Sequence, residues 1–240
     1  MIQIDALTGR LEQACQARQA ALADAETILH SARRTVYEAL LDTHESTLLA
    51  EVGDVLSGGT PSKANPEFWG GDIPWIAPKE MKAFRIADSS LCITQQAINS
   101  GAAKLVSERA VLMVVRGMIL ARAVPVAIAP RPLAINQDMK AFVPRNGHDV
   151  AFLAHMLAGA EDELLGRVEI AGHGTCKLES QAWGSLPVPR PPRSIQEEVV
   201  GKLDALAVKA DELQRLQREV EAELVAFTPA LLAKAFRGEL

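Results

Sequence analysis

The most constraining feature of the sequence is a three-four spacing of apolar residues that occurs near both ends of the chain. Near the amino terminus the spacing includes Leu7, Leu11 and Ile28, in a stretch to about residue 41 that holds no proline and one glycine. Near the carboxyl terminus it is more regular, and it includes Val199, Leu203, Leu206, Leu213, Val220 and Leu224. The spacing predicts two long helices, each with an apolar seam that a second helix would cover.

The two seams also share a register. Adding 192 to the positions of the first seam gives the second, and the segment GRLE at residues 9–12 then falls on GKLD at residues 201–204. This correspondence indicates an internal repeat whose seams pair within one chain or between two copies, although two helices rich in alanine and leucine can also match by chance. We expect Pro229 to interrupt the second helix, because proline is tolerated in a first helical turn and not in a helix interior.

The central part of the chain has a different composition, and from about residue 47 it contains glycine, proline and short runs of residues that favour β-strands. The runs predict strands at residues 111–115, 124–129 and 140–143, and helices at 150–157 and 161–165. The predicted fold class is therefore α+β. A mixed α/β domain at residues 47–192 lies between an amino-terminal helical arm at 1–46 and a carboxy-terminal helical arm at 193–240.

The charge distribution decides whether a nucleic acid is a plausible partner. The net charge of −5 argues against one, because affinity for DNA comes largely from lysine and arginine side chains that neutralise phosphates. However, residues 51–190 hold fourteen basic and fourteen acidic side chains, and within them residues 104–145 hold seven basic and two acidic ones. The composition therefore allows one basic face on the central domain, although charges spread around the domain would give the same counts.

Three other classes find no support in the sequence. The three cysteines lie far apart and have no CxxC spacing, which argues against both a disulfide framework and a zinc site. No apolar run approaches the roughly twenty residues of a membrane span. The first residues are polar and charged, where a secretory signal would be apolar. We expect a cytoplasmic protein that neither crosses a membrane nor carries a metal.

The segment from Ser57 to Lys82 is the most unusual stretch of the chain, with two glycine pairs, four prolines and two tryptophans. We expect Phe68, Trp69 and Trp75 to hold this loop-rich segment against the domain, which would leave its polar tips exposed. The physics of the segment alone favours a structural loop and a binding loop equally.

Catalytic interpretations of the same segment are weaker. Residues 58–63 lack the spacing of a phosphate-binding loop, and Pro61 removes a backbone donor that such a loop needs. Asp72 and Glu80 have the chemistry of a magnesium-dependent nuclease, but Pro74 breaks the strand pattern on which such sites are built. We therefore expect no catalytic residue in this chain, and we keep the nuclease only as a hypothesis to be tested.

Several segments can be compared with a known family. They are LAEVGDV at residues 49–55, SGGTPSKANPEFWGGDIPWIAPKEM at 57–81, AINQDMKA at 134–141, GTCK at 174–177, LPVPRPPRSIQEEVVGKLDAL at 186–206 and LLAKAFRGEL at 231–240. In this order and spacing they resemble the specificity subunits of type I restriction-modification systems.

The resemblance implies a fold and a function. Members of that family have two target-recognition domains, each followed by a long helix, and the two helices form an antiparallel coiled coil that separates two DNA half-sites. This chain has one such domain, so it resembles the carboxy-terminal half of a specificity subunit or a natural half-subunit. It would then bind part of a bipartite target in double-stranded DNA, together with a second copy in a homodimer or with a missing second half.

The resemblance also implies partners and cofactors. Methyltransferase (M) subunits would clasp the helices, bind S-adenosylmethionine and flip an adenine, and restriction (R) subunits would join the complex through them. S-adenosylmethionine, ATP and Mg would belong to those partner subunits, and no cofactor is expected in this chain.

Residues that read bases cannot be transferred from the family, because its recognition domains diverge between the shared segments. On physical grounds we select basic and polar residues of the central domain as DNA contacts, because side chains of these types usually lie on the surface and can donate hydrogen bonds to phosphates or base edges. They are Thr60, Ser62, Lys63, Lys79, Lys82, Arg85, Arg116, Arg122, Gln137 and Lys140. The alternative function is a coiled-coil scaffold that binds protein and no DNA, which the acidic total charge and the long seams favour.

Overall fold

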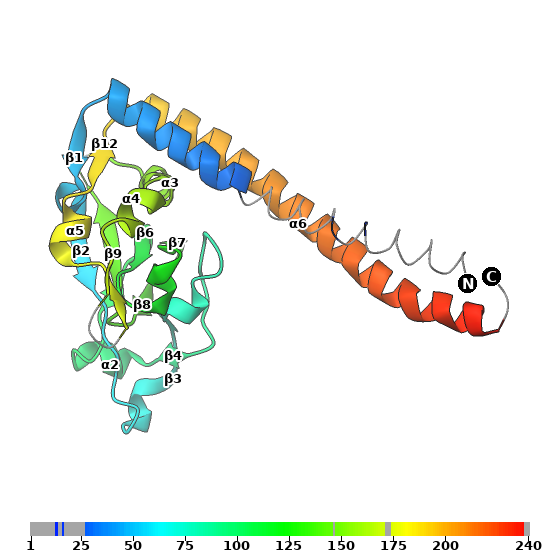
Figure 1. Ribbon diagram of the computed structural model, residues 1–240. Helices are drawn as coiled ribbons and strands as arrows, with labels where there is room; N and C mark the ends of the chain where they lie inside the picture. Colours follow the sequence, from blue (N-terminus) through cyan, green and yellow to red (C-terminus); the bar gives the residue numbers. More distant parts are fainter. Residues whose placement is uncertain (1–12, 14–15, 17–26, 146, 171–173, 238–240) are drawn as a thin grey trace. The chain divides into compact units, whose positions relative to one another are not determined.

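The computed structural model describes residues 13, 16, 27–145, 147–170 and 174–237 (Figure 1). The chain divides into two compact units, of which Arg33–Gly201 is the larger and is called the body below. Residues 1–32 and 202–240 make up the second unit. Seam residues Leu7 and Leu11 lie outside the described residues.

Two helices flank the strands of the body. The first covers residues 27–43, and the second is α6 (Arg193–Phe236), which is 44 residues long. Helix α6 continues through Pro229, so the predicted interruption there is wrong. A proline removes its own N–H from the hydrogen-bond ladder and bends a helix, but the turns on both sides of it can still form.

The predicted seam positions differ in their exposure. Leu203 is 3 % exposed, whereas Ile28, Leu213 and Val220 are 55 %, 37 % and 45 % exposed. Val199 and Leu206 are partly buried.

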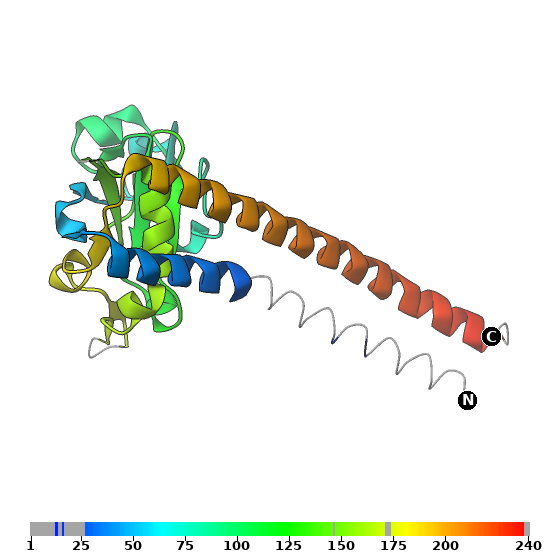
Figure 2. The same ribbon diagram turned by 90° about the horizontal axis from the view of Figure 1, so that it is seen from above.

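The main sheet of the body is antiparallel and has the strand order β2-β9-β6-β7. Its strands are β2 (Gly53–Ser57), β9 (Met139–Pro144), β6 (Ala110–Val114) and β7 (Val126–Ala129). Every residue of β6 is buried, as a continuous apolar run predicts. Helix α3 (Val150–Gly159) packs on β6, β7 and β9, and α4 (Glu161–Leu165) follows it (Figure 2). These elements confirm the predicted strands and helices of this region.

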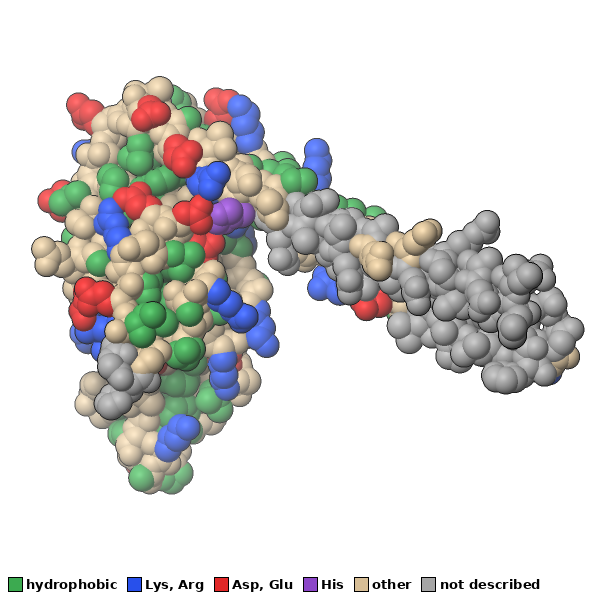
Figure 3. Space-filling view, in the orientation of Figure 1, with side chains coloured by type: hydrophobic (Ala, Val, Ile, Leu, Met, Phe, Trp, Pro, Cys, Tyr) green, Lys and Arg blue, Asp and Glu red, His purple; other side chains and the backbone are tan. Residues whose placement is uncertain are grey.

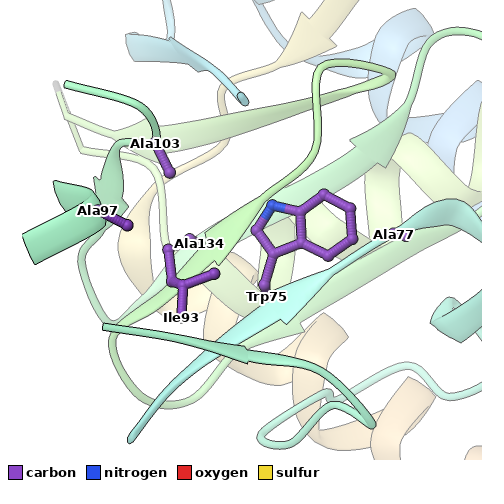
Figure 4. Close-up of a cluster of buried hydrophobic side chains, with 6 residues drawn as sticks. All are labelled: Trp75, Ala77, Ile93, Ala97, Ala103 and Ala134. Atoms are coloured by element: carbon purple, nitrogen blue, oxygen red, sulfur yellow. The ribbon is translucent and has the colours of Figure 1, made fainter. Parts of the chain in front are cut away.

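A second, mixed sheet has the strand order β4-β3-β8-β5. It consists of β4 (Cys92–Ile93), β3 (Trp69–Ile76), β8 (Leu133–Ile135) and β5 (Leu105–Val106), and β3 runs parallel to β8. In the sequence, the strands β3 and β4 of this sheet are flanked by helix α2 (Gln95–Asn99) and by the 3-10 turns η2 (Pro66–Phe68) and η3 (Pro78–Glu80). A small core of this sheet surrounds Trp75, whose neighbours are mostly alanines (Figure 4).

The body is closed by a pair of short strands. Strand β1 (Ser46–Leu48) pairs antiparallel with β12 (Pro187–Pro189), and the Arg190 amide donates to the Glu45 carbonyl at 2.7 Å. The chain therefore enters and leaves the body side by side. The remaining elements are η1 (Leu49–Glu51), η4 (Met118–Ala121), β10 (Glu169–Ile170), β11 (Cys176–Lys177) and α5 (Ser180–Gly184).

The end of the first helix is fixed to α3 and α4. The Tyr37 hydroxyl lies 3.1 Å from the Glu163 carboxylate and 2.9 Å from the Pro187 carbonyl. Burial, and then the neighbouring Glu163 carboxylate, raise the pKa of Tyr37 above its ordinary value. At Gly159 a Cβ atom would lie 2.5 Å from the Arg33 carbonyl oxygen, so the two helices meet backbone to backbone. The helix end and the body thus form one packed unit.

Candidate nucleic-acid interface

Two tryptophans hold the loop of residues 57–65, called the anchored loop below. The Trp75 indole N–H donates to the Gly59 carbonyl at 2.9 Å, and the Trp69 indole N–H donates to the Ser62 carbonyl at 3.2 Å. The two rings stand edge to face, with their centroids 5.4 Å apart. The predicted attachment of this segment by its aromatic residues is confirmed, and it leaves Thr60, Ser62 and Lys63 exposed.

Two glycines bring the anchored loop against the turn between β8 and β9. The Gly59 amide donates to the Ile135 carbonyl at 2.9 Å, and a Cβ atom on Gly58 would lie 1.9 Å from the Asn136 carbonyl oxygen. On Gly59 a Cβ atom would lie 2.9 Å from the Ala102 carbonyl oxygen. Only residues without a side chain allow three segments, distant in sequence, to approach this closely.

Polar side chains of the three segments meet at this point. The Thr60 hydroxyl donates to the Gln137 side-chain carbonyl, and the Lys140 ammonium donates to the Ser57 hydroxyl at 2.6 Å. Partial burial, and then the positive charge of Lys104, lower the pKa of Lys140. Lys104 follows Ala103, whose Cα would lie 3.6 Å from a Cβ atom on Gly59, and Lys140 lies opposite Ser57 in the β2–β9 pair. The anchored loop therefore connects the two segments that carry these lysines.

A further basic residue stands at the same turn. The backbone amides of Val115 and Arg116 donate to the Asp138 carbonyl at 2.8 and 3.2 Å. Arg116 also forms an isolated antiparallel bridge with Lys177, whose ammonium is paired with Glu179. The guanidinium of Arg116 is exposed.

We call the assembled set the turn cluster; it consists of Ser57, Thr60, Lys104, Arg116, Gln137 and Lys140. The structure thus brings together four of the residues that the sequence predicted as DNA contacts. Ser57 and Lys104 join the set without having been among the predicted contacts. Lys104 belongs to the segment whose excess of basic residues had indicated a basic face, and that excess was the signal that could have identified it.

Ser62 and Lys63 lie on the anchored loop, and the other predicted contacts lie elsewhere on the body. Lys79 and Lys82 line a cavity of about 510 Å³ together with Asp88, Ser89 and Ser90. Arg85 bridges to Ile128 of β7, and Arg122 is exposed directly after η4. Figure 3 shows Lys and Arg side chains following one another down one edge of the body.

The residues that suggested a nuclease are arranged differently from a metal site. The Glu80 carboxylate accepts hydrogen bonds from the Ser90 hydroxyl at 2.6 Å and from the amides of Ser90 and Ala77 at 3.0 and 3.2 Å. Partial burial raises the pKa of Glu80, but these bonds outweigh it and leave the pKa below its ordinary value. Asp72 is exposed on β3. Among the described residues, no group of three or more His, Cys, Asp or Glu side chains could hold a metal ion.

These features define a mixed α/β domain between two helices, in which loops and turns carry basic side chains along one edge. Within the part of the chain that the structure describes, no helix is both long and apolar enough to span a bilayer.

Comparison with known proteins identifies the family. The model of the type I restriction modification DNA specificity domain matches residues 42–224. The chain therefore belongs to this family. It is 33 % identical over 175 residues to the specificity subunit of the type I restriction enzyme EcoR124I/EcoR124II of Escherichia coli, covering 72 % of this chain and 43 % of that subunit. The chain thus spans less than half of the length of that relative.

Solved structures agree in fold. A structure described for complex assembly and conformational transition of the type I R-M system superposes with a TM-score of 0.76 at 24 % identity, covering 100 % of this chain and 58 % of the other. The HsdS subunit from Thermoanaerobacter tengcongensis gives a TM-score of 0.60 at 22 % identity, covering 100 % and 57 %. The predicted fold class, a mixed α/β domain flanked by long helices, is confirmed.

Proposed function

We propose that this chain is a DNA sequence-recognition module of a type I restriction-modification complex. Its body binds part of a bipartite target, and its helices dock the methyltransferase subunits. The observation that carries the proposal is the family match over residues 42–224, which spans nearly the whole body and extends into α6. The turn cluster and the exposed Lys63 of the anchored loop supply the positive charge that DNA phosphates require.

Charge reversal of two distant basic residues tests DNA binding. The variant K63E/R116E changes the tip of the anchored loop and the turn cluster, and both side chains are exposed, so the fold should be retained. We expect a large loss of duplex affinity and a salt dependence whose slope falls by roughly two units, because two phosphate contacts are lost. K209E, an exposed lysine on α6, is the matched control. Unchanged affinity in K63E/R116E would instead favour a protein-binding scaffold.

We further propose that the chain works as one half of a reader. Paired helical seams would then join it to a second body, from another copy or from a different chain. Co-purification with a methyltransferase subunit, followed by mapping of methylated sites in DNA, separates these arrangements. A symmetric bipartite motif supports two copies of this chain, an asymmetric motif supports a different second half, and a motif with a single short element contradicts the pairing.

The chemistry in this proposal belongs to other chains. S-adenosylmethionine, ATP and Mg are used by the methyltransferase and restriction subunits, in the cytoplasm, while this chain selects the site and catalyses nothing itself. Incubation of the purified chain with duplex DNA and Mg tests this division. Cleavage that Asp72→Ala and Glu80→Ala abolish would overturn it.

A further inference from the structure

The donors of the turn cluster that remain available to a ligand are the ammonium groups of Lys104 and Lys140 and the exposed guanidinium of Arg116. Gln137, the residue type best suited to read an adenine edge, already accepts the Thr60 hydroxyl through its carbonyl, and its amide nitrogen lies 3.5 Å from the Asp138 carboxylate. The buried Asn136 amide donates to the same carboxylate at 3.2 Å. The two side-chain amides at this turn are therefore engaged within the protein.

The lysines of the cluster are differently placed. Lys140 has three N–H donors, of which the structure gives one to Ser57. Lys104 is exposed on the segment that Gly59 approaches at Ala102 and Ala103. An anion bound where the anchored loop meets these two segments would be attracted by both ammonium groups. The Asp138 carboxylate, the acid at this turn, accepts both amide hydrogen bonds on one oxygen, and among the described residues it forms no ion pair with either lysine. A compact, hydrated ammonium is suited to a phosphate oxygen and carries little information about the base.

The backbone around these lysines fixes their positions. Ser57 and Lys140 are opposite residues in the β2–β9 pair, and the two adjoining glycines lock the anchored loop to the turn and to the Ala102 segment. A ligand that binds here meets preformed positive charge, so little ordering is required on binding.

We propose that Lys104 and Lys140 form a phosphate clamp, which grips the DNA backbone independently of sequence and sets the register of the body on the duplex. This clamp rests on the DNA binding proposed above, and it assigns base reading to residues other than these two lysines. Ser57 orients the Lys140 ammonium, and the Thr60–Gln137 pair holds the loop to the turn beside it.

The test uses the full chain and the variants K104A, K140A and K140R, with K209A on α6 as the control. Affinity is measured for two duplexes of equal length and unrelated sequence, between about 50 and 200 mM salt. We expect K104A and K140A each to lower affinity by the same factor on both duplexes, roughly fivefold, and to reduce the salt slope by about one unit. K140R and K209A should keep the wild-type slope.

Two results would overturn the clamp: an unchanged salt slope in K104A and K140A, or a loss confined to one of the two duplexes, which would indicate base reading. Thermal unfolding of each variant shows that the fold is intact. Selection of binding sites from a random duplex library by the wild-type chain tests the proposed function separately. If the wild-type chain selects no sequence but the variants change the salt slope, the proposed function is wrong and the clamp is supported. If the chain selects a sequence but the salt slopes do not change, only the clamp is wrong.

Discussion

Replacing Trp75 with phenylalanine should detach the anchored loop from the body. The substitution removes the indole N–H that holds the Gly59 carbonyl at 2.9 Å. The indole is 6 % exposed and stands edge to face with Trp69. Phenylalanine retains much of the apolar contact but cannot donate a hydrogen bond, so the carbonyl loses its partner.

Trp183 provides a matched control for the size of this effect. It is also 6 % exposed, and it stands edge to face with Phe142, at a centroid distance of 5.3 Å. Its indole nitrogen, however, has no hydrogen-bond partner among the described residues. Trp75→Phe and Trp183→Phe remove the same atoms from similar surroundings, so the loss of ring contact largely cancels in their comparison. The difference that remains is the hydrogen bond, worth about 1–3 kcal/mol when its loss leaves a carbonyl unpaired.

The measurement is thermal unfolding of the two variants under the same conditions. For a unit of this size, 1 kcal/mol corresponds to roughly 2–4 °C, so Trp75→Phe should unfold roughly 2–12 °C below Trp183→Phe. It should also bind duplex DNA more weakly, because the loop that carries Thr60 and Lys63 is released. Equal unfolding temperatures, or a lower one for Trp183→Phe, would refute the assignment of the Trp75 bond as an anchor.

Two further predictions concern stability. In urea unfolding, Gly58→Ala should lower the free energy of unfolding by about 1–3 kcal/mol, because its Cβ would lie 1.9 Å from the Asn136 carbonyl oxygen. Gly201→Ala in α6, whose Cβ would meet nothing within 4 Å, should raise that free energy by about 0.5–1 kcal/mol. Equal stability of the two variants would contradict this reasoning. Burial, and then Arg190, lower the pKa of His148 below 6.5. The unfolded chain therefore binds a proton before the folded chain does, and the free energy of unfolding should fall as the pH drops below about 6.5. His148→Gln should reduce that fall between roughly pH 7.5 and 5.5; an unchanged pH profile would show that His148 is not responsible.

Local patterns were sufficient to predict much of the body. The apolar run of β6 and the bounds of α4 follow from residues adjacent in the sequence, since burial and hydrogen bonding within each element depend on its own side chains. Pro229 marks the limit of such reasoning. A local helix-breaking signal was outweighed by the continuous helix-forming sequence on both sides of it.

The turn cluster could be predicted only in part. Thr60 and Gln137 are 77 residues apart, and no local pattern indicates that they share a hydrogen bond. Their meeting depends on the register of β2 with β9 and on two glycines that allow backbones to touch. A preference for basic and polar residues selected four members of the cluster, but it also selected Lys79 and Lys82, which line a cavity of their own.

The β1–β12 pair brings together the two ends of the segment that it encloses. Since its two ends leave through adjacent, hydrogen-bonded strands, the segment between Ser46 and Pro189 is inserted like a cassette. Recombination at this strand pair could exchange this segment for another and leave the length of the helices unchanged, provided that the new segment kept the contacts of Gly159 and Glu163 with the first helix. A new binding preference could then arise in a single genetic event, without any redesign of the surfaces on which the rest of an assembly depends.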